Sequence, residues 1–159
     1  MYPVHDVDAI LLLSLAVAAK RRPADLIEIA TAIDLAQETM PSSNKLSDAF
    51  ARLSAYGLII EIDGGYTLSA DAQKMMENQR KKDDHAKRIY KLKEHLADYH
   101  LQGDYPTVLI HPDKIQAAVD AHFKAKKSGV RNLLMPKTQA QIDLKKQPFN
   151  PFYSRKRRD

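Results

Sequence analysis

The fold is decided by residues 55–76, AYGLIIEIDGGYTLSADAQKMM. Gly57 follows a helical pattern and is free to take the left-handed conformation that ends many helices. The residues after it predict a strand, a tight hairpin turn and a short return strand, at 58–62, 63–65 and 66–68. Ser69 is suited to cap a further helix, whose first turn would hold Asp71. The stretch therefore predicts a small β-hairpin between two helices.

Three helices are predicted before the hairpin. Apolar residues surround almost the whole circumference of the first, from Val7 to Val17, so we expect it to be covered on several sides, partly by a second copy of the chain. Pro23 suits the first turn of the second helix. Ser42 or Ser43 would cap the third, whose inward stripe is formed by Leu46, Ala49, Phe50 and Leu53.

The order of these elements resembles the winged helix-turn-helix superfamily. The likeness is carried by LSDAFARLSAYGLI (46–59) followed by EIDGGYTLSADAQ (61–73), and it covers about the first half of the chain. The resemblance implies a third helix that reads the major groove of DNA, with the hairpin as its wing. The linker between the second and third helices is longer than the tight turn of a standard helix-turn-helix.

We therefore expect a mainly α fold with a small β-hairpin (α+β), in three parts. A winged helix-turn-helix domain takes up 1–78, a basic and mostly helical extension 79–135, and an extended basic C-terminal arm 136–159. In the extension, apolar residues from Ile89 to Tyr99 form a single helical seam. Residues 108–110 suggest a short strand, Ser128-Gly129 closes a further helix, and 130–135 read as another strand or an apolar anchor.

Charge is unevenly distributed along the chain. The net charge of +5 is the sum of −5 over residues 1–78 and +10 over residues 79–159. A polyanion would therefore be attracted to the second half.

The composition also indicates a compartment. Cys is absent, which fits a reducing environment. The apolar run 9–19 is too short to span a bilayer and is preceded by Asp6 and Asp8, where a signal peptide would carry positive charge. We expect a cytoplasmic protein that does not contact membranes.

Enzymatic chemistry has little support in the sequence. Only five Gly are present, and none form a nucleotide-binding loop. The six His lack partners at metal-ligand or catalytic spacing, so we expect no enzyme activity, no metal and no cofactor.

Residues that suit contacts with nucleic acid occur in three places. On the third helix, Asn44 and Arg52 suit base edges, whereas Ser43 and Lys45 suit phosphates. In the extension and the arm, cations suit the flanks of a duplex or a groove. The predicted nucleic-acid-binding residues are Ser43, Asn44, Lys45, Arg52, Lys87, Lys91, Arg155, Lys156, Arg157 and Arg158.

Two functions remain open. The first is a DNA-binding transcriptional regulator that acts on double-stranded DNA as a homodimer, with the first helix and the seam 89–99 as the dimer surface. The second is a winged-helix module for protein–protein interaction or assembly, with the basic tail as an anchor. The first is the leading expectation, although the acidic side chains of Asp48, Glu61 and Asp63 would repel phosphate, which the basic second half only partly offsets.

Overall fold

The computed structural model describes residues 3–37, 39–77, 79–80, 82–100 and 103–134, and only the backbone of 130–134. The chain divides into two compact units, residues 1–125 and residues 126–159. The elements of the described residues are α1 (Asp6–Ala18), α2 (Leu26–Ala36), α3 (Ser43–Ala55), β1 (Ile59–Ile62), β2 (Gly65–Leu68), α4 (Ala70–Glu77), α5 (His85–Asp98) and α6 (Pro112–Leu134).

The structure is mainly α-helical with one two-stranded antiparallel hairpin, which confirms the predicted fold class for the first unit. The order of three helices, hairpin and helix is compatible with a winged helix. Gly57 ends α3 with a φ of 70°, as predicted. Ser69 precedes α4, and its hydroxyl oxygen accepts a hydrogen bond from the Ala72 backbone N–H at 3.4 Å.

Several predicted boundaries were wrong. The second helix begins at Leu26 rather than at Pro23, because Asp25 and Glu28 form a reciprocal capping box at its start. Residues 108–110 belong to no strand. Finally, α6 runs past Ser128-Gly129 to Leu134, so the predicted helix end and the strand that would follow it are both replaced by helix over the described residues.

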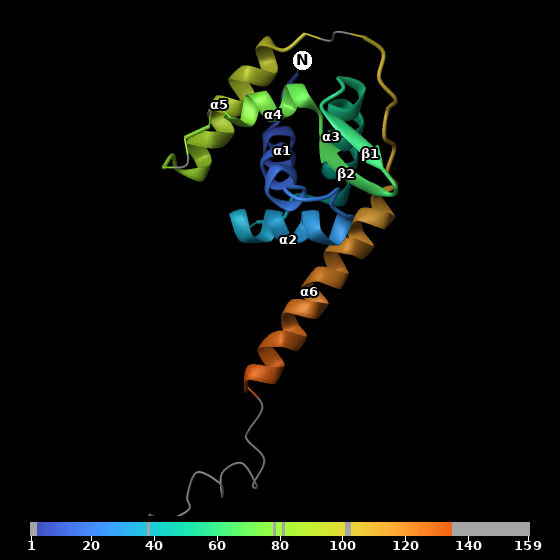
Figure 1. The fold of residues 1–159 in the computed structure, drawn as a ribbon. Helices are drawn as coiled ribbons and strands as arrows, with labels where there is room; N and C mark the ends of the chain where they lie inside the picture. The colour runs from blue at the N-terminus through green and yellow to red at the C-terminus, as the bar shows by residue number, and fades with distance from the viewer. Residues whose placement is uncertain (1–2, 38, 78, 81, 101–102, 135–159) are drawn as a thin grey trace, which may run out of the picture. The chain divides into compact units, whose positions relative to one another are not determined.

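Helix α1 lies at the centre of the first unit and is surrounded by the same chain (Figure 1). It packs against α2, α3, α4, α5 and β2, and residues 8–15 are all buried. The predicted coverage on several sides is confirmed, but its source is the chain's own elements. The seam of α5 is also used internally, because Leu92 and Leu96 are fully buried in the core that includes α1. The buried parts of both surfaces proposed for a dimer, residues 8–15 of α1 and Leu92 and Leu96 of α5, are therefore covered within one chain, whereas Val17 at the end of α1 is 64% exposed.

The hairpin closes with a two-residue turn. Asp63 and Gly64 have φ values of 49° and 78°, and Ile62 pairs with Gly65 across the turn. Positive φ at both central residues is the requirement of the type I′ turn, which matches the twist of the strands. On the far side of β2, the backbone N–H and C=O of Tyr66 bond to Ala24 at 2.8 and 2.9 Å.

Residues 103–111, here called the strap, connect α5 to α6 and cross α3 on the way. The Val108 N–H donates to the Ser54 hydroxyl at 2.8 Å, and the Ser47 hydroxyl donates to the Ile110 carbonyl. Near its start, the ring of Tyr105 lies directly over Gly57. The strap is therefore fixed at three points along α3.

Candidate functional site

The start of α3 presents three of the predicted nucleic-acid-binding residues together. Ser42 is the cap, and its hydroxyl oxygen accepts from the Lys45 backbone N–H at 3.5 Å. Asn44 and Lys45 are exposed in the first turn, and Ser43 beside them is half-buried. These side chains form a small polar surface on one end of the helix.

Arg52 lies apart from that surface because it is engaged by α1. Its guanidinium donates to one oxygen of Asp8 through two nitrogens, at 2.7 and 3.2 Å. The Asp8 side chain is fully buried, and its other oxygen accepts from the His5 backbone N–H at 2.9 Å. Arg52 thus neutralises a buried carboxylate, and its side chain remains only 29% exposed.

The outward face of α3 is narrow. The strap covers one flank through Ser47 and Ser54, and the ion pair with Asp8 occupies the other. Between the flanks lie Asp48, which is exposed, and the half-buried Ala51 and Ala55. This face offers one negative charge and small apolar groups.

The outer face of the hairpin is apolar. Ile60 and Ile62 are two residues apart on β1 and so lie on the same face, where they are 41% and 44% exposed. Glu61 on the opposite face lies close enough to Tyr66 to support the raised pKa of that phenol, whose main cause is burial. Together with Asp63 in the turn, Glu61 gives the hairpin a negative charge. A hairpin that held DNA phosphates would present Lys or Arg here.

A groove separates β1 from the strap. Its volume is about 520 Å³. Its walls are formed by the end of α3, β1 and the turn on one side and the strap on the other, and the lining residues are Gly57, Ile59, Ile60, Glu61, Asp63, Gly64, Tyr105, Pro106, Thr107 and Val108. The charged side chains among them are both acidic, and the remainder are mainly apolar.

The predicted cations of α5, Lys87 and Lys91, are paired with Asp83 in the turn before their own helix. Lys91 donates to Asp83 at 2.6 Å, and Lys87 lies 3.6 Å from the same carboxylate. The hydrogen bond from Lys91, supported by the charges of both lysines, lowers the pKa of Asp83 below its ordinary value of 3.8. These two lysines are therefore less available to an external phosphate than the sequence suggested.

The positive charge of the chain is concentrated in the second unit. Residues 1–125 contain 15 Lys and Arg against 18 Asp and Glu, a net charge of −3. Residues 126–159 contain 10 against 2, a net charge of +8. The predicted residues Arg155, Lys156, Arg157 and Arg158 belong to this part and lie outside the described residues.

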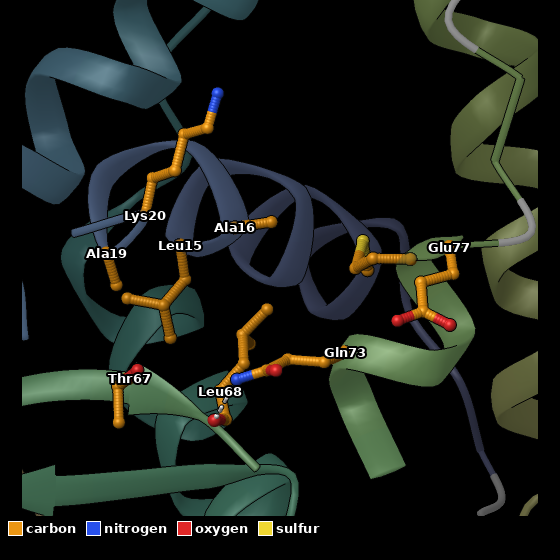
Figure 2. A pocket seen from close by; sticks show the side chains of 9 residues that line it. Leu15, Ala16, Ala19, Lys20, Thr67, Leu68, Gln73 and Glu77 are labelled. Carbon is orange, nitrogen blue, oxygen red and sulfur yellow. Dashed lines mark hydrogen bonds between the residues drawn. The ribbon is translucent and has the colours of Figure 1, made fainter. Parts of the chain in front are cut away.

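A second pocket is lined by the C-terminal end of α1, by β2 and by α4 (Figure 2). Its volume is about 360 Å³, and Leu15 and Leu68 contribute to its apolar wall. The Gln73 amide is bound to the Leu68 carbonyl at 3.3 Å. Figure 2 shows the Lys20 ammonium pointing away from the other lining side chains. The polar groups do not converge on one point, as they do in a typical ligand site.

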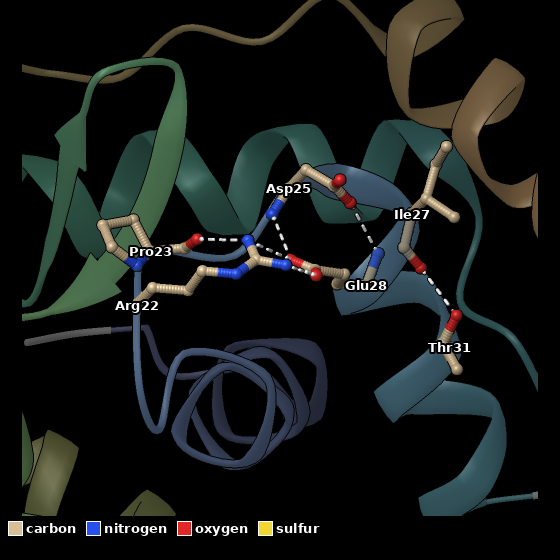
Figure 3. A network of polar contacts seen from close by, with 6 residues as sticks. All are labelled: Arg22, Pro23, Asp25, Ile27, Glu28 and Thr31. Carbon is tan, nitrogen blue, oxygen red and sulfur yellow. Dashed lines mark hydrogen bonds and ion pairs between the residues drawn. The ribbon is translucent and has the colours of Figure 1, made fainter.

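One of the basic residues before α2, Arg22, is bonded to its capping network (Figure 3). The Arg22 guanidinium donates to both oxygens of Glu28 and to the Pro23 carbonyl. Glu28 in turn accepts from the Asp25 N–H at 3.0 Å, and Asp25 accepts from the Glu28 N–H at 2.8 Å. This network fixes the start of α2 and leaves Arg22 largely occupied.

A Thr–His–Asp row joins α2 to α6 within the first unit. The His122 ring nitrogens lie 3.0 Å from Asp34 Oδ2 and 3.0 Å from Thr31 Oγ1. The composition is that of a hydrolytic triad, but the Thr31 hydroxyl donates its hydrogen to the Ile27 carbonyl at 2.8 Å. A nucleophile must give its proton to the histidine, so we assign the row as a clamp between helices. Over the described part of the chain, His, Asp and Glu form no group of three or more that could hold a metal ion.

Sequence reasoning missed the pairs that join distant segments. The capping pattern His5-x-x-Asp8 marks the start of α1, but nothing in it indicates Arg52 as the partner of Asp8. Ser47 and Ser54 lie seven residues apart, and so on one face of α3, which was a usable signal for a segment bound along that face.

No family model, curated protein or solved structure matches the chain. None of the described helices is long and apolar enough to cross a membrane. The likeness to a winged helix therefore depends on the order and geometry of the elements alone.

Proposed function

We propose that the chain is a protein–protein interaction module of the winged-helix kind, which docks a partner protein on its hairpin and carries a basic tail. The observation that supports this most directly is the apolar outer face of the hairpin. Ile60 and Ile62 are exposed side by side on the strand that a DNA-binding winged helix would line with cations.

The charge distribution supports the same proposal. The first unit has a net charge of −3, and the charged residues nearest the hairpin surface, Glu61 and Asp63, are acidic. Binding to DNA depends strongly on neutralised phosphates, so an acidic unit with an acidic hairpin is poorly suited to it.

The contacts of α3 agree with this interpretation. Arg52, the residue best suited to a guanine edge, neutralises the buried Asp8 instead. Asp48 occupies the centre of the outward face, where it would repel phosphate.

The proposal is tested with two matched double variants of the full chain. Ile60→Lys with Ile62→Lys changes the hairpin face, and Asn44→Ala with Lys45→Ala changes the start of α3. Affinity purification from cells that express the chain should recover a partner that the hairpin variant loses and the α3 variant keeps. Thermal unfolding of both variants checks that the fold is intact.

A DNA-binding regulator is the second candidate, favoured by one specific observation. Asn44 and Lys45 are exposed in the first turn of α3, where winged helices contact base edges and phosphates. Selection from a random DNA pool distinguishes the candidates. An enriched sequence whose binding depends on Asn44 and Lys45 would replace the interaction module with the regulator.

A further inference from the structure

The backbone of β1 is paired on one edge only. Ile62 and Gly65 flank a two-residue turn, so Ile60 and Ile62 bond to β2 and the backbone groups of Ile59 and Glu61 point the opposite way. The neighbouring bonds agree with this parity, because the Leu58 carbonyl accepts from the Ser69 N–H at 2.9 Å. Among the described residues, none bonds to the outward N–H and C=O groups of Ile59 and Glu61.

The two edges of the hairpin differ in this respect. Tyr66 points its N–H and C=O away from β1 in the same alternating manner, and both groups are bonded to Ala24. The outer edge of β2 is thus covered, whereas the outer edge of β1 faces the groove.

The strap forms the opposite wall of the groove without pairing with β1. Its hydrogen bonds go to α3, through Val108 and Ile110, and the Tyr105 ring rests on Gly57. The intervening residues, Pro106 and Thr107, are exposed. The strap therefore leaves about 520 Å³ beside an open strand edge.

We propose that this groove binds an extended basic peptide segment of a partner protein, which adds to the free edge of β1 as an antiparallel or parallel strand. The inference depends on the proposed interaction function and specifies its partner. The charge of the groove selects a basic segment, because its charged lining residues, Glu61 and Asp63, are both acidic.

The alternation along β1 also predicts the pattern of the partner strand. Ile60 and Ile62 lie on one face of the hairpin, and Glu61 lies on the other. Cross-strand neighbours on each face complement one another. The added strand should therefore alternate apolar residues, beside the isoleucines, with Lys or Arg, beside Glu61.

The test uses the full chain and a labelled synthetic peptide, acetyl-GKVKVKG-amide, with acetyl-GEVEVEG-amide as the control of opposite charge. Binding is measured by fluorescence anisotropy. We expect the basic peptide to bind and the acidic peptide to bind at least about tenfold more weakly, because it places like charges opposite Glu61 and Asp63.

Two substitutions of Glu61 distinguish the contribution of its backbone hydrogen bond to peptide binding from the contribution of its charge. Glu61→Pro removes the outward N–H, which the hairpin does not use, and proline is tolerated at such an edge position. It should weaken binding by about tenfold or more, since it removes both a strand hydrogen bond and the charge. Glu61→Gln keeps the N–H and removes only the charge, so it should weaken binding by about two- to fivefold. Circular dichroism checks that both variants are folded.

Amide hydrogen exchange gives the direct readout. Saturating peptide should slow the exchange of the Glu61 amide by about tenfold or more, because that N–H becomes a strand donor. Peptide binding that leaves the Glu61 amide unchanged, equal binding of the two peptides, or no binding at millimolar peptide would each overturn the inference. If the inference fails while Ile60→Lys with Ile62→Lys still loses a partner, the proposed function stands without it.

Discussion

The ion pair of Arg52 changes the role that its position on α3 predicts. Its position on α3 suits a guanine edge, yet its guanidinium is bound to the fully buried Asp8. A buried carboxylate needs a partner, because its desolvation is unfavourable when no opposite charge compensates. If substitution of Arg52 abolished DNA binding, the cause could therefore be unfolding of the chain as well as loss of a contact with a base.

We expect Arg52→Ala to lower the free energy of unfolding by about 3 kcal/mol, because it leaves the Asp8 carboxylate buried and unpaired. Urea denaturation measures the change. In a double-mutant cycle, Asp8→Asn should make the subsequent loss of Arg52 much less destabilising. If Arg52→Ala is as stable as the parent chain but loses affinity for a DNA sequence, Arg52 is a reading residue.

Gly57 is constrained by its conformation and by a neighbour. A Cβ at this position would lie 2.5 Å from Cδ2 of Tyr105, and the φ of 70° already disfavours other residues. Gly64 has a similar φ of 78° but nothing within 4 Å, so it is the matched control. We expect Gly64→Ala to lower the free energy of unfolding by about 1–2 kcal/mol, and Gly57→Ala to lower it by about 1 kcal/mol more, because of overpacking.

Thermal or urea unfolding measures both glycine variants. If the extra loss at Gly57 comes from the Tyr105 ring, it should disappear when Gly57→Ala is combined with Tyr105→Ala. An equal loss at the two glycines would mean that the strap is not seated on the end of α3.

At the scale of elements, the strap is held by two serines of unequal burial. Ser54 and the Val108 N–H that it accepts from are both buried, whereas Ser47 is half-buried. Ser54→Ala should destabilise the chain by about 1–3 kcal/mol, because it leaves a buried N–H without an acceptor. Ser47→Ala should cost about 1 kcal/mol or less. Urea denaturation of the two variants compares them, and equal losses would contradict the proposed difference.

The free energy of unfolding should depend on pH through Asp83, which lies in the turn before α5. Lys91 donates to Asp83 and lowers its pKa below 3.8, so the stabilisation is fully present above that value. It is lost as the pH falls through the lower pKa of the folded state. The stability difference between the parent chain and Asp83→Asn should therefore shrink between about pH 6 and pH 3. Denaturation at the two pH values measures it, and a constant difference would argue against the pairing.

The elements could be predicted where the signal was local. The stop at Gly57 and the cap at Ser69 each depend on neighbouring residues, and each was found. The hairpin turn, predicted at 63–65, was found one residue shorter, at Asp63-Gly64. The start of α2 was misplaced because the capping box of Asp25 and Glu28 outweighs the preference of Pro23 for a first turn. The end of α6 was misplaced because Ser128-Gly129 weakens a helix but does not have to end it.

At the scale of the whole molecule, charge separates the two units. The net charge of the chain, +5, combines −3 in the first unit with +8 in the second. We expect any binding of the full chain to duplex DNA to be independent of sequence and to depend on residues 126–159.

Four substitutions test this dependence: Arg155, Lys156, Arg157 and Arg158, each to Ala. The slope of log affinity against log salt should become less steep by about 3–4 units if all four cations contact phosphates. The matched control is Lys87→Ala with Lys91→Ala, which should change the slope little, because both lysines lie against Asp83. A larger change of slope in the control would mean that α5, rather than the C-terminal cations, contacts the DNA phosphates.

The candidate site was only partly foreseeable. The acidic hairpin charges at Glu61 and Asp63 were visible in the sequence, but the groove needs the strap, which returns to α3 from residues 105–108. The sequence also suggested a second copy around α1, since an all-round apolar helix does not identify what covers it. Long-range packing decided both points.

The strap also has a consequence for the order in which the chain folds. Its contacts join Ser54 to Val108 and Ser47 to Ile110, across separations of 54 and 63 residues. Such contacts close long loops and form only after α3 offers a surface to receive them. We predict that the strap docks after the folding transition state, so weakening it with Ser54→Ala should accelerate unfolding while leaving the rate of folding nearly unchanged, as stopped-flow kinetics would measure. If that prediction holds, the groove beside β1 forms late in folding and is among the first features lost when the chain begins to open.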